Sequence, residues 1–276
     1  MTEIGGSDPR HPVAIPDRDS AITLAWAAAT DTGHKRAANE DSYVAKSPLF
    51  AVADGMGGHS AGDLASAAVV QRLSEAVVAD FMAPGDIEKA LEVATEDIDR
   101  IAGDSELGVG TTVTGAVLTL EGGEPYFAVF NIGDSRVYQF ERNELAQVTV
   151  DHSVVQEMVD SGMISKVDAE YHPDSNIITR AVGFNSQPTP DLWLIPIRAG
   201  LRLLLCSDGL TNEVSDDRIR LHLSAGLSAS ETAAALVDAA LAAGGKDNIT
   251  MVVVDVLEGP RDFELESTIP QRTGRH

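Results

Sequence analysis

Residues 51–62, AVADGMGGHSAG, place an aspartate directly behind an apolar run and in front of several glycines. Asp-Gly and Gly-Gly are common turn signals, so the segment is compatible with a simple corner after a strand. Alternatively, Gly55, Gly57 and Gly58 leave space beside the Asp54 carboxylate, so that a charged group can approach it. This second interpretation predicts that other carboxylates lie near Asp54.

Further acidic residues stand next to predicted strands. Short segments rich in β-branched or aromatic residues predict strands at 49–53, 111–120, 125–131, 136–140, 201–206 and 249–256. The acids next to strands are Asp54, Asp134 and Asp208, which follow them, and Asp247, Glu40 and Asp41, which precede the last strand and the segment SYVA. In antiparallel sheets the end of one strand lies beside the start of its neighbour, so we expect these acids at one sheet edge.

A group of acids at one edge indicates a metal site, although each aspartate alone is also a routine turn residue. Several carboxylates would repel one another and shift each other's pKa unless cations neutralised them. Oxygen ligands without cysteine or paired histidine favour Mg²⁺ or Mn²⁺ over Zn²⁺, and the sequence does not distinguish the first two.

A positive charge precedes the acids in TDTGHKRAANED, where Arg36 stands four residues before Glu40. A guanidinium near a metal cluster is suited to hold a phosphate through two parallel hydrogen bonds. The alternative interpretation is a surface salt bridge between Arg36 and Glu40.

Helical patterns occur in blocks apart from the strands. Apolar spacing predicts helices over 70–77 and 87–101, the second ending at Gly103. A capping-box spacing of Ser228 and Glu231 begins a third helix, which Gly244 ends. Runs of strands with separate helices predict an α+β fold with antiparallel sheets and outer helices.

Composition restricts the classes of function. The 276 residues carry 43 acidic and 20 basic side chains, a net charge of −23, which opposes nucleic-acid binding. No apolar run reaches the roughly 20 residues of a membrane helix, and the N-terminus is unlike a signal peptide, so we expect a cytoplasmic protein with no membrane partner. The single cysteine, Cys206, lies in an apolar run and is predicted to be a buried thiol.

Only the two ends of the chain lack periodicity. Residues 1–20 contain three prolines and are predicted to be flexible, and residues 258–276 are predicted to be a disordered tail. No internal repeat or linker divides the remainder, so one domain is expected over 21–257.

Seven motifs stand in a fixed order: TDxGxxRxxNED, ADGMGGHSAG, GTT, NIGDSRVY, DHS, CSDGL and KDNIT. Together they resemble the metal-dependent, type 2C (PPM) serine/threonine protein phosphatases in their bacterial form, from about residue 24 to 257. The resemblance implies a four-layer α-β-β-α sandwich with two central antiparallel sheets. It also implies hydrolysis of phosphoserine and phosphothreonine by a metal-activated water, without a protein nucleophile.

The resemblance implies roles for individual residues. Asp54 would bridge two Mn²⁺ or Mg²⁺ ions, and Arg36 would bind the substrate phosphate. The other residues implied at the metals are Asp208 and Asp247 for the first ion, Glu40 and the Gly55 carbonyl for the second, Asp134 with Asp208 for a third, weaker ion, and Asp41 and Asn248 as supporting residues behind the ligands.

Two features of the resemblance leave open questions. Eukaryotic members have a histidine after the Asp-Gly pair, where this chain has Met56 as bacterial members do. His59 could replace it as the acid that protonates the leaving group, or could instead shape the glycine loop. Residues 154–185 resemble the flap beside the active site of bacterial members, which we expect to help select substrates.

Two other functions are compatible with these motifs: a catalytically inactive relative that binds phosphoproteins, and a metal-dependent hydrolase of small phosphorylated molecules. The presence of every acid that the motifs require favours the phosphatase. Its expected partners are phosphorylated proteins, in particular Hanks-type serine/threonine kinases and their targets, and a monomer is assumed.

Overall fold

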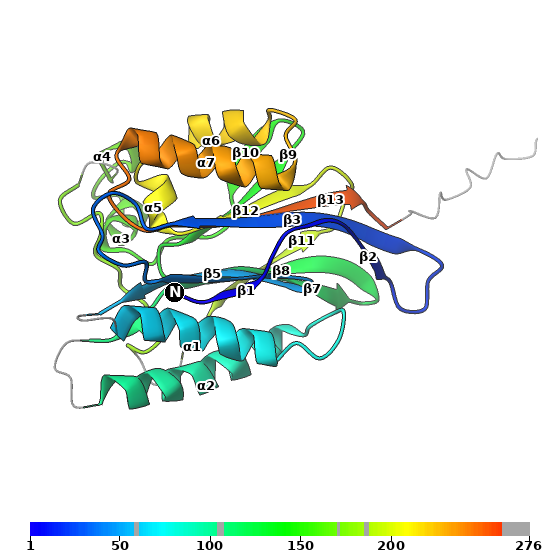
Figure 1. Cartoon of the computed structure of the whole chain (residues 1–276), viewed down its shortest axis with the longest axis horizontal. Coiled ribbons are helices and arrows are strands. Elements are labelled where there is room, and N and C mark those ends of the chain that lie inside the picture. The colour runs from blue at the N-terminus through cyan, green and yellow to red at the C-terminus, as the bar shows by residue number, and fades with distance from the viewer. Residues whose placement is uncertain (58–60, 104–107, 170–171, 185–187, 261–276) are drawn as a thin grey trace, which may run out of the picture.

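Two β-sheets pack face to face and helices cover both outer faces, giving four layers (Figure 1). The computed structural model describes residues 1–57, 61–103, 108–169, 172–184 and 188–260. The predicted four-layer α+β sandwich is confirmed.

The first sheet has the strand order β1-β4-β5-β7-β8-β11, and β6 pairs with the end of β5. Its strands are β1 (Glu3–Gly5), β4 (Asp41–Lys46), β5 (Leu49–Met56), β6 (Gly110–Thr111), β7 (Val113–Glu121), β8 (Glu124–Ile132) and β11 (Asp191–Pro196). All neighbours are antiparallel except β1 and β4, which run parallel. Both sheets are thus mainly antiparallel as predicted, and this edge pair is the parallel exception among the described strands.

The second sheet has the order β10-β9-β12-β13-β3-β2 and is antiparallel throughout. Its strands are β2 (Asp8–Ala14), β3 (Ala21–Asp31), β9 (Arg136–Glu141), β10 (Glu144–Gln147), β12 (Arg202–Cys206) and β13 (Ile249–Glu258). In the central strand β13, Val252 and Val254 face the first sheet, whereas Met251 and Val253 face helices. Burial on both faces explains why this strand is a continuous apolar run.

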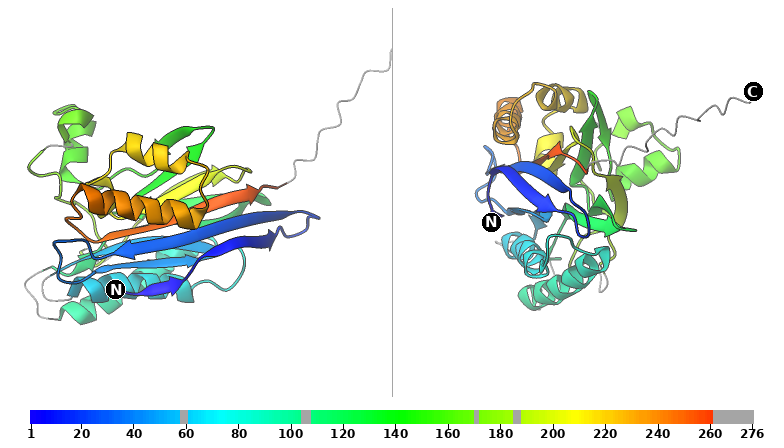
Figure 2. Two further views of the ribbon diagram at one scale, coloured as in Figure 1. Left: turned by 45° about the horizontal axis from the view of Figure 1, so that its top comes forward. Right: turned by 90° about the vertical axis from the view of Figure 1, so that its right-hand side faces the viewer.

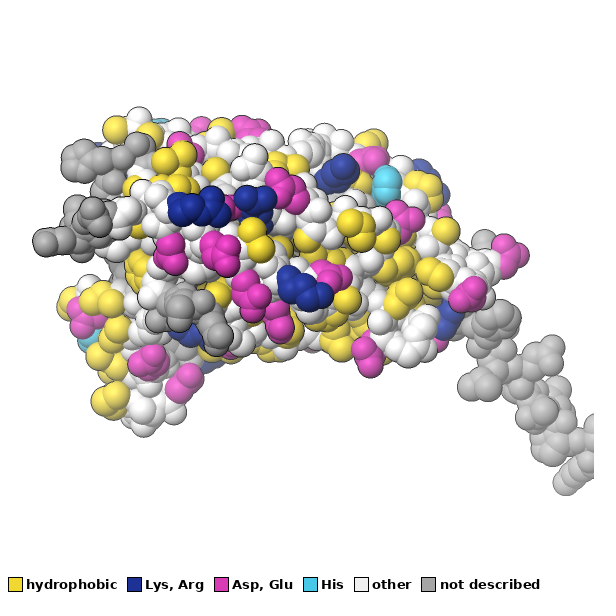
Figure 3. Space-filling view, turned by 90° about the horizontal axis from the view of Figure 1, so that it is seen from below, with side chains coloured by type: hydrophobic (Ala, Val, Ile, Leu, Met, Phe, Trp, Pro, Cys, Tyr) yellow, Lys and Arg dark blue, Asp and Glu magenta, His cyan; other side chains and the backbone are white. Residues whose placement is uncertain are grey.

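Helices α1 (Ala61–Glu75) and α2 (Pro84–Ala102) cover the first sheet, and α5 (Asp208–Thr211), α6 (Asp216–Leu223) and α7 (Ala229–Ala243) lie over the second. The predicted ends of α2 and α7 are confirmed. Gly103 caps α2, and the capping box of Ser228 and Glu231 begins α7, which ends at Gly244. On the outer face of α1 and α2, basic residues lie beside acidic ones (Figure 3), as in the pairs of Arg72 with Asp97 and Glu75.

The predicted flap contains α3 (Val154–Asp160) and α4 (Lys166–Ala169), which lie to one side of the layers (Figure 2). An isolated bridge joins Val182 of this segment to Thr111 of β6, and a second one pairs Ile178 with Ser153, the residue before α3. Cys206 is buried as predicted. None of the helices in the described ranges has the length and apolar character that a bilayer-spanning helix needs.

The prediction that residues 1–20 are flexible is wrong, because they contain β1 and β2. Pro9 and Pro12 are tolerated in β2 because this strand forms an edge of its sheet, where a missing N–H need not break the ladder. At the other end, β13 includes Glu258, and residues 261–276 of the predicted tail lie outside the described residues.

Candidate metal centre

Five of the six predicted acids, all except Glu40, come together where strands of the two sheets end. Asp41 opens β4 and pairs in register with Asp54 on β5. Asp208 opens α5 directly after β12, and Asp247 stands two residues before β13. The charges of Asp41, Asp134, Asp208 and Asp247 all act on Asp54. The convergence expected from strand ends is therefore present in the structure.

Asp54 is fixed by the threonines of the GTT motif. Its amide donates to Thr112 Oγ1 (3.0 Å), and its carbonyl accepts from Thr111 Oγ1 (2.9 Å) and from the Thr112 amide (2.9 Å). Thr112 Oγ1 also shares a hydrogen bond of 2.8 Å with Ser135 Oγ, next to Asp134. These threonines thus tie the backbone of Asp54 to the turn that carries Asp134.

The glycine after Asp54 serves the packing of the protein's own backbone. A Cβ at Gly55 would lie 2.1 Å from the Gly62 carbonyl oxygen and 2.6 Å from the Glu40 carbonyl oxygen. Clearance for an approaching ligand therefore does not explain Gly55. Gly57 has a more open position, where a Cβ would come no closer than 3.5 Å to any described atom, and Gly58 and His59 lie outside the described residues.

Asp41 and Asp208 are linked through the intervening Ser207. The Ser207 hydroxyl donates to Asp41 Oδ2 (2.9 Å), and the amide of Thr250 donates to Ser207 Oγ (3.0 Å). Asn212 Nδ2 donates to Asp208 Oδ2 (3.0 Å) from the end of α5. Ser207 was not among the predicted site residues, because a serine before an aspartate does not by itself indicate a buried link between two acids.

Burial and mutual repulsion raise the pKa values of four acids. Burial, together with the charges of Asp208 and Asp247, raises the pKa of Asp41 to about 7. Burial and the charge of Asp208 raise the pKa of Asp134 to about 8. The pKa values of Asp54 and Asp208 are also raised, first by burial and then by neighbouring aspartates. Ionised together, these groups would destabilise the fold unless a cation were bound.

Arg36 is paired with Asp247 rather than with Glu40. Its Nη2 donates to Asp247 Oδ2 at 2.7 Å, and the Arg36 side chain is 52% exposed. This hydrogen bond, together with the charges of Asp247, Asp54 and Asp208, raises the pKa of Arg36 above its usual value. The guanidinium therefore lies beside the acidic cluster and remains open to solvent.

Asn248 holds the loop that carries Arg36 and Glu40. Its Nδ2 donates to the carbonyls of Thr32 (2.9 Å) and Ala38 (3.0 Å), and its Oδ1 accepts from the Glu40 amide (2.8 Å). This amide side chain fixes both ends of the loop against the start of β13.

Replacing Asn248 by alanine is expected to lower the free energy of unfolding by about 2–3 kcal/mol, because three backbone groups in partly buried hydrogen bonds lose their partners. Urea denaturation measures this loss. Asn212→Ala, which removes one exposed hydrogen bond, is expected to cost less than about 1 kcal/mol. Equal losses in the two variants would contradict the positioning of the loop by Asn248.

The acidic cluster fits a hard divalent cation. Asp41 Oδ1 and Asp208 Oδ1 are buried and have no hydrogen-bond partner among the described atoms. A cation would satisfy such oxygens and relieve the repulsion, and an all-oxygen set suits Mg²⁺ or Mn²⁺. In the described ranges no three acidic, histidine or cysteine side chains already stand as a complete ligand set, and Asp247 is held by Arg36.

Comparison with known proteins identifies the family of this chain. The family model for protein phosphatase 2C matches residues 29–244. The serine/threonine phosphatase stp of Listeria welshimeri is 37% identical over 239 residues, which cover 82% of this chain and 93% of that protein.

Solved structures of serine/threonine phosphatases are also similar to this chain. The crystal structure of the Mycobacterium tuberculosis serine/threonine phosphatase PstP/Ppp superposes with a TM-score of 0.77 at 38% identity, covering 85% of this chain and 99% of that one. The catalytic domain of PstP in complex with two manganese ions gives a TM-score of 0.75 at 37% identity, covering 86% and 99%. The chain belongs to the protein phosphatase 2C family.

Proposed function

We propose that the protein is a metal-dependent phosphatase that hydrolyses phosphoserine and phosphothreonine in other proteins. The observation that carries this proposal is the group of buried acids with raised pKa values at the meeting of the two sheets, beside the exposed Arg36. The relatives named above are serine/threonine phosphatases, and one of them was crystallised with two manganese ions.

The residues that would hold the ions are those at the acidic cluster: Asp54, Asp208, Asp247, Glu40 and the Gly55 carbonyl, with Asp134 and Asp208 for a third ion. When bound, Mn²⁺ or Mg²⁺ supplies Lewis acidity that lowers the pKa of a coordinated water and neutralises phosphoryl charge. Asp41 and Asn248 would hold the ligands in place through Ser207 and the Glu40 amide. The Asp247 carboxylate would turn from Arg36 to the metal, which frees the guanidinium for phosphate.

Arg36 would bind the substrate phosphate. Replacing it by alanine is expected to lower kcat/KM by about 10- to 100-fold, mainly through a higher KM, because the anion loses a charge-assisted bidentate partner. The affinity for Mn²⁺ should stay equal or rise, since Asp247 loses its competing partner. Steady-state kinetics and calorimetric Mn²⁺ titration separate the two effects.

The neighbouring Lys35→Ala serves as the matched control and is expected to change kcat/KM less than about threefold, as for an exposed surface charge. An Arg36→Ala variant with unchanged KM and weakened Mn²⁺ binding would instead assign Arg36 to the support of the metal ligands.

The proposed function is tested by phosphate release from a phosphothreonine peptide in Mn²⁺, with EDTA as the control. Metal-dependent release that EDTA abolishes is expected. Binding of the peptide without turnover would indicate an inactive phosphoprotein-binding relative. Turnover of small phosphate esters at kcat/KM values well above those of phosphopeptides would indicate a small-molecule hydrolase.

We also propose the substrates, the cellular location and the oligomeric state of the enzyme. Hanks-type kinases and their targets in the cytoplasm are the proposed substrates, and a monomer is the proposed state. The net charge of −23 supports protein substrates with basic patches and disfavours nucleic acid. Residues 154–185 would contribute to substrate choice, which exchange of this flap for that of a relative would test through a changed peptide preference.

A further inference from the structure

The first 14 residues connect the outer edges of the two sheets on one side of the sandwich. β1 pairs with β4 at the edge of the first sheet, and β2 pairs with β3 at the edge of the second. Figure 1 shows this dark-blue segment passing from the lower sheet to the upper one. We call residues 2–14 the N-terminal strap. It precedes residues 29–244, which the family model matches.

The beginning of the strap is connected to the backbone of Glu40. The Thr2 amide donates to Ser42 Oγ (2.9 Å), and the Thr2 carbonyl accepts from the Tyr43 amide (3.0 Å). Ser42 Oγ shares a hydrogen bond of 2.9 Å with Ser66 Oγ, which donates to the Glu40 carbonyl (2.6 Å). Ser42 and Ser66 are fully buried, so the hydrogen bond between their hydroxyls is shielded from water.

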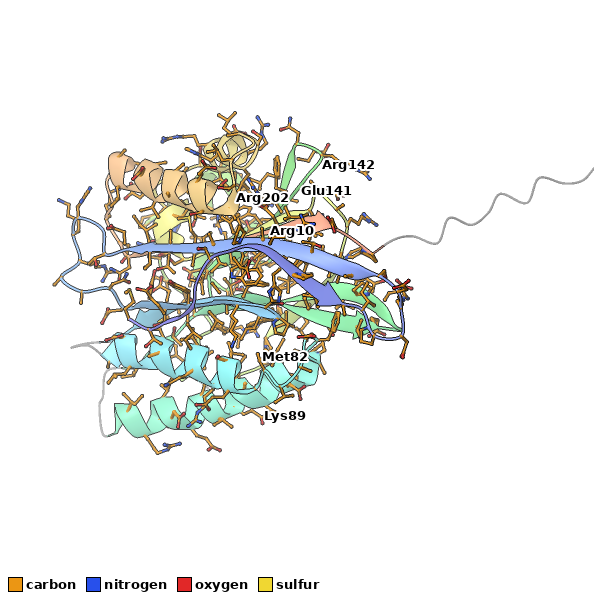
Figure 4. All side chains as sticks on the ribbon, turned by 45° about the vertical axis from the view of Figure 1, so that its right-hand side comes forward. Arg10, Met82, Lys89, Glu141, Arg142 and Arg202 are labelled. Atoms are coloured by element: carbon orange, nitrogen blue, oxygen red, sulfur yellow. The ribbon has the colours of Figure 1, made fainter. Side chains whose placement is uncertain are left out.

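The end of the strap is anchored in the core between the sheets. Val13 is 2% exposed and belongs to that core, and the His11 ring packs edge-on against Trp26 at 5.1 Å. Arg10, labelled in Figure 4, donates to Glu258 Oε1 of β13 at 2.6 Å. Asp247 and Asn248 precede the opposite end of β13, so the strap contacts this strand at the end away from the acidic cluster.

The acids of the cluster come from both sheets. Glu40, Asp41 and Asp54 belong to the first sheet or its entry, whereas Asp208 and Asp247 stand at the ends of strands in the second. The facing sheets pack mainly through apolar side chains, whose packing is not directional. Directional contacts between them include the hydrogen bond from Ser207 to Asp41 and one from Trp26 Nε1 to the Ala45 carbonyl (3.0 Å). A metal site loses affinity when the groups that support its ligands are loosened, typically by 10- to 100-fold.

We infer that the N-terminal strap holds the acids of the two sheets at the spacing that metal binding requires, and so sets the affinity for Mn²⁺. This inference rests on the proposed function. It assigns Thr2, Ser42 and Ser66 as positioning residues that act through the Glu40 backbone.

Gly5 offers a way to displace β1 without touching the cluster. It has φ +85°, and a Cβ at this position would lie 2.3 Å from the Ala45 carbonyl oxygen. Gly5→Ala therefore cannot keep the β1 pairing intact. The adjacent Gly6 has no described atom within 4 Å of a Cβ position and no positive φ, so Gly6→Ala is a matched control.

The test compares the Mn²⁺ dissociation constants of wild type, Gly5→Ala and Gly6→Ala by calorimetry, with hydrogen exchange of the Tyr43 amide as the readout of β1. Gly5→Ala is expected to bind Mn²⁺ about tenfold more weakly and to exchange the Tyr43 amide faster. Gly6→Ala is expected to match wild type in both. Ser66→Ala, which leaves β1 in place, is expected to weaken Mn²⁺ binding without faster exchange at Tyr43.

An unchanged Mn²⁺ dissociation constant in Gly5→Ala overturns the inference, whatever the exchange at Tyr43, because the structure has no room for a Cβ with β1 in place. Equal weakening in Gly6→Ala overturns it as well. Wild-type protein that binds no Mn²⁺ would refute the proposed function instead, which keeps the two failures distinct.

Discussion

Replacing Asp208 by asparagine is expected to lower phosphate release from a phosphothreonine peptide by about a thousandfold, or about 4 kcal/mol in activation free energy. Asp208 opens α5 within the acidic cluster, and its Oδ1 is buried without a hydrogen-bond partner among the described atoms. The substitution keeps the shape of the side chain but removes the charge that would attract a cation. The loss should appear in kcat at saturating peptide and Mn²⁺.

The control for this variant is Asp238→Asn, which changes an exposed acid on α7 and should retain full turnover. Without metal, Asp208→Asn should also be more stable to heat than wild type, because the pKa of Asp208 is raised by burial and by Asp247. Turnover within tenfold of wild type in Asp208→Asn would refute a metal-binding role for Asp208.

Metal-free protein is expected to lose stability between pH 5 and pH 8, with a fall in Tm of about 5 °C or more. The folded-state pKa values of Asp41, Asp54, Asp134 and Asp208 lie above the ordinary value for aspartate, at about 7 for Asp41 and about 8 for Asp134. Groups with raised pKa values contribute stability below the unfolded-state pKa near 4. They lose this contribution as the pH rises through the folded-state values.

Saturating Mn²⁺ is expected to remove most of this fall, because the cation takes the place of the protons on the carboxylates. Thermal unfolding in EDTA and in Mn²⁺, at matched pH values from 5 to 8, measures the difference. If Mn²⁺ raised the Tm more at pH 5 than at pH 8, ionisation of this cluster would not be the cause of the lost stability.

The sequence was sufficient to predict the convergence of the acids. Asp54, Asp208 and Asp247 flank strands that alternation and β-branched residues mark clearly, and antiparallel pairing brings such ends together. The end of α2 at Gly103 and the start of α7 at Ser228 could also be predicted, because each depends on a few residues that are neighbours in the sequence. These features need no information about distant contacts.

Other features depend on contacts that have no local signal. Strand β3 contains AWAAAT, and alanine has little strand preference, so its pairing with β13 and β2 makes this segment a strand. Pro9 and Pro12 suggested a flexible start, whereas edge pairing determines β2. The sequence offered only Glu40 as an ion-pair partner of Arg36, because Asp247 is 211 residues away. Gly55 was assigned to ligand clearance, since the approach of Gly62 is a tertiary contact.

The most direct test is a calorimetric titration of metal-free protein with Mn²⁺, which counts the ions bound and gives their affinities. Wild type should bind at least two ions with release of protons near pH 7, as expected for acids with raised pKa values. Asp208→Asn should lose at least one of these ions. Wild-type protein that binds no Mn²⁺, or an Asp208→Asn variant that binds the same number with equal affinity, would contradict a metal centre at this cluster.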